Sequence, residues 1–208
     1  VSPLGIFALI MKMTVTVGLD TIVPLLGYMG VVASALWVHA FLILPFVLVF
    51  IAHRSPIALA RQQLSALVTA FSTATSSGAL PIVLKSFKDP NDHRVASFVM
   101  PIGTTVNMNG TALYVASTVA FLAQYYGVAL GPVQYGILIS LTLLSAVSAA
   151  AMPGSSLVTM SVALAALGIP MEGIGMIVAV DLLLDMSRTA VNVWGNAVAT
   201  LVMVRLAD

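Results

Sequence analysis

Residues Asp181–Asn196, DLLLDMSRTAVNVWGN, are the stretch from which the fold of this chain is best interpreted. Its polar residues are separated by 4, 3, 1, 3 and 4 positions, so they form one stripe on a helix of 3.6 residues per turn. The remaining positions are mostly Leu, Val, Ala and Met, which suit lipid or a packed helix bundle. The stripe consists of Asp181, Asp185, Arg188, Thr189, Asn192 and Asn196.

The charges on this stripe indicate a functional site. Near the centre of a membrane-spanning helix, each ionised group costs roughly 2.5–3.5 kcal/mol. Two carboxylates and a guanidinium on one face therefore imply a polar cavity, a bound ion, or a substrate with complementary charges. The alternative is an internal ion-pair network that only holds the bundle together. We favour a site, because ionisable groups within the membrane are functional by default.

Composition predicts an all-α integral membrane protein. Of the 208 residues, 60% are hydrophobic and only 7% are charged, whereas about a quarter are charged in globular domains. The mean hydropathy is +1.10. The absence of cysteine excludes disulfides and thiol chemistry, and the net charge of +1 gives no sign of a nucleic-acid partner. We expect a multi-pass protein of the cell inner (plasma) membrane with membrane lipid around it.

Residues 1–52 are predicted to form N-terminal transmembrane helices. Gly27–Ile51 is a clear span, whereas Leu4–Val17 is short for one. Because the chain is already apolar at Leu4, we expect a further portion to precede it. His39 lies within the clear span, and a single histidine there is more often packed against a neighbouring helix than used as a proton relay.

Residues 53–208 are predicted to form a transport core that begins with a re-entrant hairpin over 56–90. Small residues at 72–78, followed by Pro81, interrupt its apolar segment. Basic residues flank both sides, so both flanks are expected on the cytoplasmic side and the segment must turn back. Such a turn is tolerated only where it is buried in protein or lines a cavity. The flanking residues are Arg54, Arg61, Lys85, Lys88 and Arg94.

The rest of the core repeats this pattern with the opposite orientation. A broken helix is predicted over 93–127, a second hairpin over 133–168 and a last helix over 173–206. The second hairpin has no Lys or Arg on its flanks, which is typical of the outward side. Paired interrupted segments with inverted-repeat character indicate a transporter whose substrate binds near the middle of the membrane.

The residue types at these positions suggest an acidic amino acid as substrate. Helix N-termini at the two hairpin tips suit a carboxylate. Arg188 can bind a second carboxylate through two hydrogen bonds, and Asp185 can accept hydrogen bonds from an ammonium group. Unwound carbonyl groups near Gly103, Asn107 and Asn192 suit a hard cation such as Na⁺.

Four motifs in this order resemble one family. They are TSSGALP at Thr75–Pro81, NMNGT at Asn107–Thr111, Pro153-Gly154, and DMSRTAVN at Asp185–Asn192. With them, essentially the whole chain resembles the C-terminal half of the dicarboxylate/amino acid:cation symporters, the glutamate transporter homologues. The resemblance implies a transport domain that slides as an elevator against a trimeric scaffold, with no enzymatic activity. It implies a homotrimer where that scaffold is present.

The resemblance also implies roles for single residues. Asp185 would bind the substrate amino group and Arg188 its side-chain carboxylate, while the first tip and the second tip close over the substrate. The substrate-binding set is Ser76, Ser77, Thr111, Met152, Pro153, Gly154, Asp185, Arg188, Thr189 and Asn192. The cation set is Gly103, Asn107, Asn192, Asn196 and Asp181.

The chain departs from the family pattern at several positions. Asn109 and Asn196 stand where sodium-coupled members carry aspartates, and losing two anionic ligands should weaken Na⁺ binding. Ala74 and Met186 occupy the two positions where an additional arginine is found. Ala151 replaces a common glycine of the second tip, which should stiffen it.

We therefore favour coupling to H⁺, with Asp181 or Asp185 as the proton carrier, over coupling to Na⁺. A C4-dicarboxylate carrier is an alternative, although Asp185 would repel a substrate without an amine. A truncated, non-transporting half is a second alternative. An intramembrane hydrolase is disfavoured, because Ser76 and Ser155 lack a nearby base: His39 is the only histidine within a span.

Overall fold

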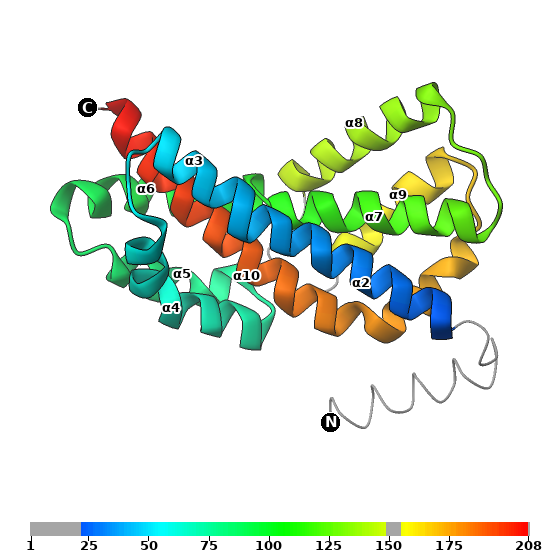
Figure 1. Ribbon diagram of the computed structural model, residues 1–208, viewed down its shortest axis with the longest axis horizontal. Helices are drawn as coiled ribbons and strands as arrows, with labels where there is room; N and C mark the ends of the chain where they lie inside the picture. The colour runs from blue at the N-terminus through cyan, green and yellow to red at the C-terminus, as the bar shows by residue number, and fades with distance from the viewer. Residues whose placement is uncertain (1–21, 149–154, 208) are drawn as a thin grey trace.

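The computed structural model describes residues 22–148 and 155–207, which form helices and no strand (Figure 1). This confirms the predicted all-α fold class. In chain order the elements are α2 (Ile22–Val38), the π-helix η2 (His39–Ile43), α3 (Leu44–Phe50), α4 (Pro56–Thr73), α5 (Ser76–Ser86), α6 (Pro90–Val106), α7 (Asn109–Tyr125), α8 (Pro132–Ser148), α9 (Ser155–Ala166), the 3₁₀ turn η3 (Met171–Gly173) and α10 (Ile174–Ala207).

Helix α10 is the central element, and it packs against every helix from α2 to α7. Two apolar clusters surround it. One joins α2, α7, α9 and the first half of α10 around Tyr114 and Ile177. The other joins α3, α4, α5, α6 and the second half of α10 around Met100 and Val198. The polar stripe runs along α10 through the region where these two clusters meet.

Helices α2, η2 and α3 form one continuous segment, Ile22–Phe50. Its 29 residues, roughly 43 Å of helix, make it the one part of the described chain that is long and apolar enough to cross a bilayer. The π-helix within it has a local cause. Leu44 donates its N–H to His39 O, while Pro45 has no N–H to offer the next carbonyl, that of Ala40. Trp194 Nε1 donates to Ala40 O instead, at 3.0 Å.

Helices α4 and α5 form a hairpin with a two-residue connection. Ser55 Oγ caps α4 by accepting from Ala58 N, and α4 ends at Ala74, which adopts a left-handed conformation with φ of 49°. Helix α5 then packs back against α4. The Gln62 side chain donates to Ser86 O at 2.7 Å, so the start of α4 and the end of α5 lie side by side.

The same end of the molecule gathers most of the positive charge. The end of α3, the link between α5 and α6 and the last turn of α10 all lie there, whereas α2 starts and α7 ends at the opposite end (Figure 1). Arg54 pairs with Asp92 at 3.2 Å and ties the α3–α4 loop to α6. Six of the eight Lys and Arg residues lie at or near this end: Arg54, Arg61, Lys85, Lys88, Arg94 and Arg205.

A substitution at the start of α6 measures how much its N-cap contributes to the free energy of unfolding. Asp89 caps α6 by accepting from Asn91 N and Asp92 N at 2.9 and 3.1 Å. Asp89→Ala should lower the free energy of unfolding by about 1 kcal/mol, as losing an N-cap typically does. Asp89→Asn retains an acceptor and should cost much less. Thermal unfolding in detergent compares the two variants, and equal losses would contradict the capping role.

Candidate functional site

The polar stripe of α10 lies inside the protein. Its six members are each no more than 7% exposed, so the face predicted from their spacing is turned inward. Helices α6 and α7 pack against α10, and the chain between them is interrupted at Asn107 and Met108, which are the C-cap of α6 and the N-cap of α7. The stripe therefore faces a break in a neighbouring helix.

Arg188 and Asp185 form a buried ion pair. Arg188 Nη2 lies 2.5 Å from Asp185 Oδ1, and Thr189 Oγ1 also donates to that oxygen, at 3.3 Å. The guanidinium carbon of Arg188 lies 4.2 Å from the centre of the Tyr114 ring, within the range of a cation–π interaction. Arg188 Nη1 is buried with no hydrogen-bond partner among the described residues. The ion pair that the ion-network alternative predicts is therefore present between Arg188 and Asp185. It leaves Arg188 Nη1, a charged donor, without a hydrogen bond in the described part of the chain.

Asp181 belongs to a separate polar chain. Tyr114 Oη donates to Asp181 Oδ1 at 2.6 Å, and Thr118 Oγ1 donates to Tyr114 O at 2.7 Å. Tyr28 Oη lies 2.8 Å from Thr118 Oγ1, which extends the chain to α2. Tyr114 thus joins the two halves of the stripe: its hydroxyl binds Asp181 while its ring covers Arg188.

Asparagine amides join the break between α6 and α7 to α10. Asn107 Nδ2 donates to Asn196 Oδ1 at 2.8 Å, while Asn196 Nδ2 is buried with no partner among the described residues. The backbone N–H of Gly110 donates to Asn192 Oδ1 at 2.7 Å, and Asn192 Nδ2 donates to Thr111 Oγ1 at 3.2 Å.

Two glycines allow this close approach. A Cβ atom at Gly103 would lie 2.6 Å from Asn196 Oδ1, and one at Gly110 would lie 2.9 Å from the carbonyl oxygen of Arg188. Both distances are too short for a side chain, so α6 and α7 can meet α10 in this way only with glycine at these positions.

The expected cation residues are only partly brought together. Gly103, Asn107 and Asn196 meet at the end of α6, and Asn192 lies one turn before Asn196. Asp181 is fifteen positions before Asn196, about 22 Å along a regular helix, and it accepts a hydrogen bond from Tyr114. The meeting point therefore holds amides and backbone groups without a carboxylate. Hard cations are held mainly by carboxylate and carbonyl oxygens, so this set is a weak fit for Na⁺.

The residues expected at the two hairpin tips make few contacts with the polar stripe in the described part of the chain. Ser76 is the first residue of α5 and is buried, whereas Ser77 is exposed. Helix α5 packs against α10, yet no hydrogen bond joins Ser76 or Ser77 to the stripe among the residues the structure describes. The expected second-tip residues Met152, Pro153 and Gly154 lie outside the described residues.

Sequence reasoning missed Tyr114, Thr118 and Trp194. Tyr114 and Thr118 follow Thr111 at three and seven positions, the spacing of one helix face, so the motif at 107–111 could have pointed to them. Trp194 gave no such signal, because its bond to Ala40 depends on the π-helix. His39 begins that π-helix, and its Nε2 is buried without a partner in the described chain.

Comparison with known proteins gives a consistent result. The family model described as the sodium:dicarboxylate symporter family matches residues 1–206. Excitatory amino acid transporter 3 of Homo sapiens is 40% identical over 99% of this chain and 40% of its own length. An excitatory amino acid transporter of Caenorhabditis elegans is 41% identical over 94% of this chain and 40% of its own length. Excitatory amino acid transporter 2 of Mus musculus is 40% identical over 94% of this chain and 35% of its own length.

The chain thus spans about two fifths of the length of the curated relatives it matches. Those relatives are transporters rather than enzymes, and the family implies a membrane protein. The motifs quoted from the sequence, the buried stripe of α10 and the match over residues 1–206 agree: this chain belongs to the sodium:dicarboxylate symporter family.

Proposed function

We propose that this chain provides the substrate-binding core of a secondary active symporter for acidic amino acids, glutamate or aspartate. The observation that carries the proposal is the buried Arg188–Asp185 pair with one Arg188 nitrogen still unpaired. A carboxylate of the substrate would bind this free nitrogen, and its amine would bind Asp185. The names of the relatives, excitatory amino acid transporters, agree with this substrate class.

Substrate binding would exchange one set of partners for another. Without substrate, Arg188 and Asp185 neutralise each other at 2.5 Å. An amino acid with an acidic side chain offers both a carboxylate and an ammonium group, so it can satisfy the two side chains at once. Thr189 contacts the pair, Asn192 lies one turn further along the stripe, and Thr111 of α7 accepts a hydrogen bond from Asn192. These residues would complete the site, which Ser76, Ser77 and residues 152–154 would close.

Charge favours an amino acid over a C4-dicarboxylate. The described stripe holds two carboxylates and one guanidinium, all at least 93% buried. A dicarboxylate brings two negative charges, whereas aspartate or glutamate brings one net negative charge and an ammonium group for Asp185. In an interior of low dielectric constant, the additional negative charge is unfavourable unless a cation accompanies it.

We favour H⁺ as the coupling ion, with Na⁺ as the alternative that the family name supports. Asn109 and Asn196 are neutral, and the amide cluster makes hydrogen bonds within itself. Proton coupling needs a carboxylate that exchanges its proton with water. Asp181 and Asp185 are the candidates on the stripe.

The architecture proposed for the whole protein follows the family resemblance. Residues 1–52 would be N-terminal transmembrane helices and residues 53–208 the transport core of a multi-pass protein of the plasma membrane. The hairpin of α4 and α5 would be re-entrant, α8 and α9 would form its inverted counterpart, and the core would move as an elevator within a homotrimer. The start of α4 and the end of α5 lie side by side at the basic end, which supports this proposal for the first hairpin.

The role of Arg188 is tested by its removal. Arg188→Ala should weaken aspartate binding by at least about 30-fold, since breaking a buried charge pair costs roughly 2 kcal/mol or more. Calorimetry and substrate-dependent thermal stabilisation of the purified protein provide the measurement. Arg61→Ala, which removes an exposed arginine, is the control and should bind normally. Undiminished affinity in Arg188→Ala would contradict the assignment. A native protein that neither aspartate, glutamate nor succinate stabilises would favour the non-transporting alternative.

The role of Asp185 is tested by selectivity. Asp185→Ser removes the charge that binds the amine, so the affinity for succinate relative to aspartate should rise about tenfold or more. Competition binding with the two ligands measures this ratio, which is insensitive to a general loss of folded protein. If the variant discriminates against succinate as strongly as the native protein does, Asp185 does not bind the substrate amine.

The coupling ion is tested at the amide cluster. Asn109→Asp with Asn196→Asp should make uptake depend on Na⁺. Each aspartate retains the acceptor oxygen that receives a hydrogen bond from Gly110 N or Asn107 Nδ2, and adds a negative charge. Reconstituted uptake of aspartate under separate Na⁺ and H⁺ gradients compares the native and doubly substituted proteins. Uptake that stays indifferent to Na⁺ in the double variant would count against this account of coupling.

A further inference from the structure

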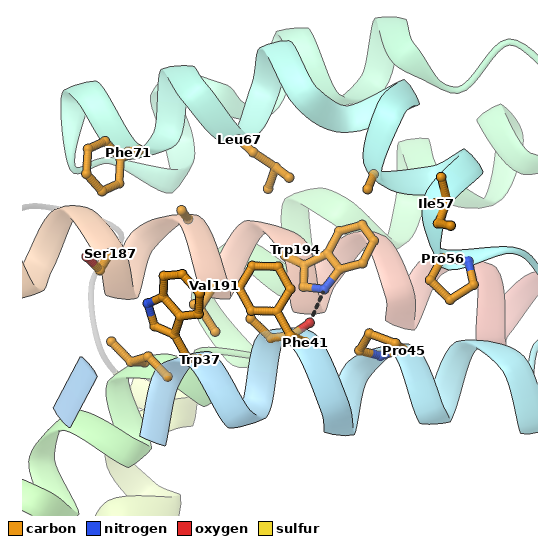
Figure 2. Close-up of a pocket in the computed structure, with 14 residues that line it drawn as sticks. Trp37, Phe41, Pro45, Pro56, Ile57, Leu67, Phe71, Ser187, Val191 and Trp194 are labelled. Carbon is orange, nitrogen blue, oxygen red and sulfur yellow. Dashed lines mark hydrogen bonds between the residues drawn. The ribbon is translucent and has the colours of Figure 1, made fainter. Parts of the chain in front are cut away.

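A lateral groove of about 570 Å³ lies between the α2–η2–α3 segment, α4 and α10 (Figure 2). Its walls are mostly aromatic and aliphatic. The residues that matter for its ligand are Trp37, Phe41, Pro45, Ile57, Phe71 and Trp194. The groove is separate from the polar stripe, because Ser187, Ala190, Val191 and Trp194 lie on the opposite face of α10 from Asp185, Arg188 and Asn192.

The groove offers few hydrogen-bonding groups to a polar ligand. Trp194 Nε1 donates to Ala40 O, and Ser187 Oγ donates to Leu183 O, so these two donors of the lining are already used; the indole N–H of Trp37 is the third side-chain donor. Trp37 and Phe41 are 67% and 64% exposed, and they belong to the segment that is apolar enough to cross a bilayer. One wall of the groove thus belongs to the segment suited to lipid, and its ligand must be apolar where it contacts Trp37 and Phe41.

One end of the groove is positively charged. Pro45, Pro56 and Ile57 lie together at this end, and Phe71 and Ser187 lie at the other (Figure 2). Arg54 is two residues before Pro56, and Arg61 is one turn after Ile57. Arg54 is half exposed although it pairs with Asp92, while Arg61 is exposed and has no ion-pair partner among the described residues. Two arginines and one carboxylate thus lie close in the chain to, or pair with, the residues at this end of the groove.

The dimensions fit a lipid chain. Helix α4 borders the groove from Pro56 to Phe71, a distance of about 22 Å along the helix, which exceeds the roughly 15 Å of hydrocarbon in one leaflet. An acyl chain that enters at the basic end can follow α4 over the whole depth of a leaflet. Basic residues at the membrane surface select anionic headgroups.

We propose that this groove binds an anionic phospholipid, with its headgroup at Arg61 and Arg54 and one acyl chain between α4 and the α2–α3 segment. Within the proposed function this rests only on the membrane location and not on the substrate. The lipid would contact α10 at Ser187–Trp194, directly behind the residues assigned to substrate binding.

The chain carries its own probes for this site. Its two tryptophans, Trp37 and Trp194, both line the groove. Bromine atoms on an acyl chain quench tryptophan fluorescence on contact. We therefore expect brominated phosphatidylglycerol to quench the reconstituted protein at least twofold more, per lipid, than brominated phosphatidylcholine. No substrate is needed, so the result is independent of whether the protein transports amino acids.

Two variants separate the groove from general attraction to the basic end. Arg61→Gln should abolish the preference for phosphatidylglycerol, whereas Arg94→Gln, which removes an exposed arginine of α6, should retain it. Ala190→Leu leaves every charge in place and fills the groove, so it should also abolish the preference. Thermal unfolding in detergent at the temperature of the native protein confirms that Arg61→Gln is folded.

Three outcomes would overturn the proposal. They are equal quenching by the two lipids in the native protein, an unchanged preference in both Arg61→Gln and Ala190→Leu, or tryptophans that neither lipid quenches. The last result would mean that another segment or a second copy of the chain covers the groove. Cross-linking that joins two copies through residues of the groove would identify the second copy as its occupant.

Discussion

The structure depends on how two opposite charges are accommodated in an apolar bundle. Arg188 and Asp185 are taken out of water, and their mutual attraction at 2.5 Å only partly offsets the cost of removing two charges from solvent. The Tyr114 ring and the Thr189 hydroxyl add favourable contacts. A buried ion pair adds little stability compared with well-packed apolar residues of the same volume. Its presence at the centre of α10, with one donor nitrogen unpaired, is therefore better explained by ligand binding than by folding.

Helix α10 separates two chemically different environments. Its polar face contacts the break between α6 and α7, where amides and backbone N–H groups meet. Its opposite face, at Ser187–Trp194, borders an apolar groove, where Ser187 Oγ and Trp194 Nε1 both donate to carbonyl groups of the protein. Any rotation or sliding of α10 would disturb both sides at once. Tyr114 and Trp194 fix this helix from opposite faces, one through Asp181 and Arg188 and the other through the carbonyl of Ala40.

The periodicity of α10 and the interruption at 107–108 could be predicted from the sequence, because local spacing and helix-breaking residues determine both. The partners of the polar groups could not. Residues at i and i+3 on a helix can pair with each other or with a ligand, so the spacing of Asp185 and Arg188 leaves both possibilities open. The bond between Asn107 and Asn196 joins positions 89 residues apart, and no local pattern encodes it. Likewise, Pro45 predicts a disturbed helix without indicating that Trp194 would satisfy the exposed carbonyl.

The amide cluster suggests how one fold can serve different coupling ions. Asn107 donates to Asn196, and Asn192 bonds to both Gly110 N and Thr111 Oγ1, so the cluster is made of neutral groups that bond to one another. A carboxylate at position 196 would keep the acceptor for Asn107, yet its charge would be buried beside backbone and amide oxygens and would need a cation to balance it. In the proposed account of coupling, the need for a cation therefore depends on oxygen-for-nitrogen exchanges at positions 109 and 196, in side chains of nearly unchanged shape. Because each aspartate would keep the acceptor oxygen of the asparagine it replaces, this proposal changes the coupling ion without requiring a change in helix packing.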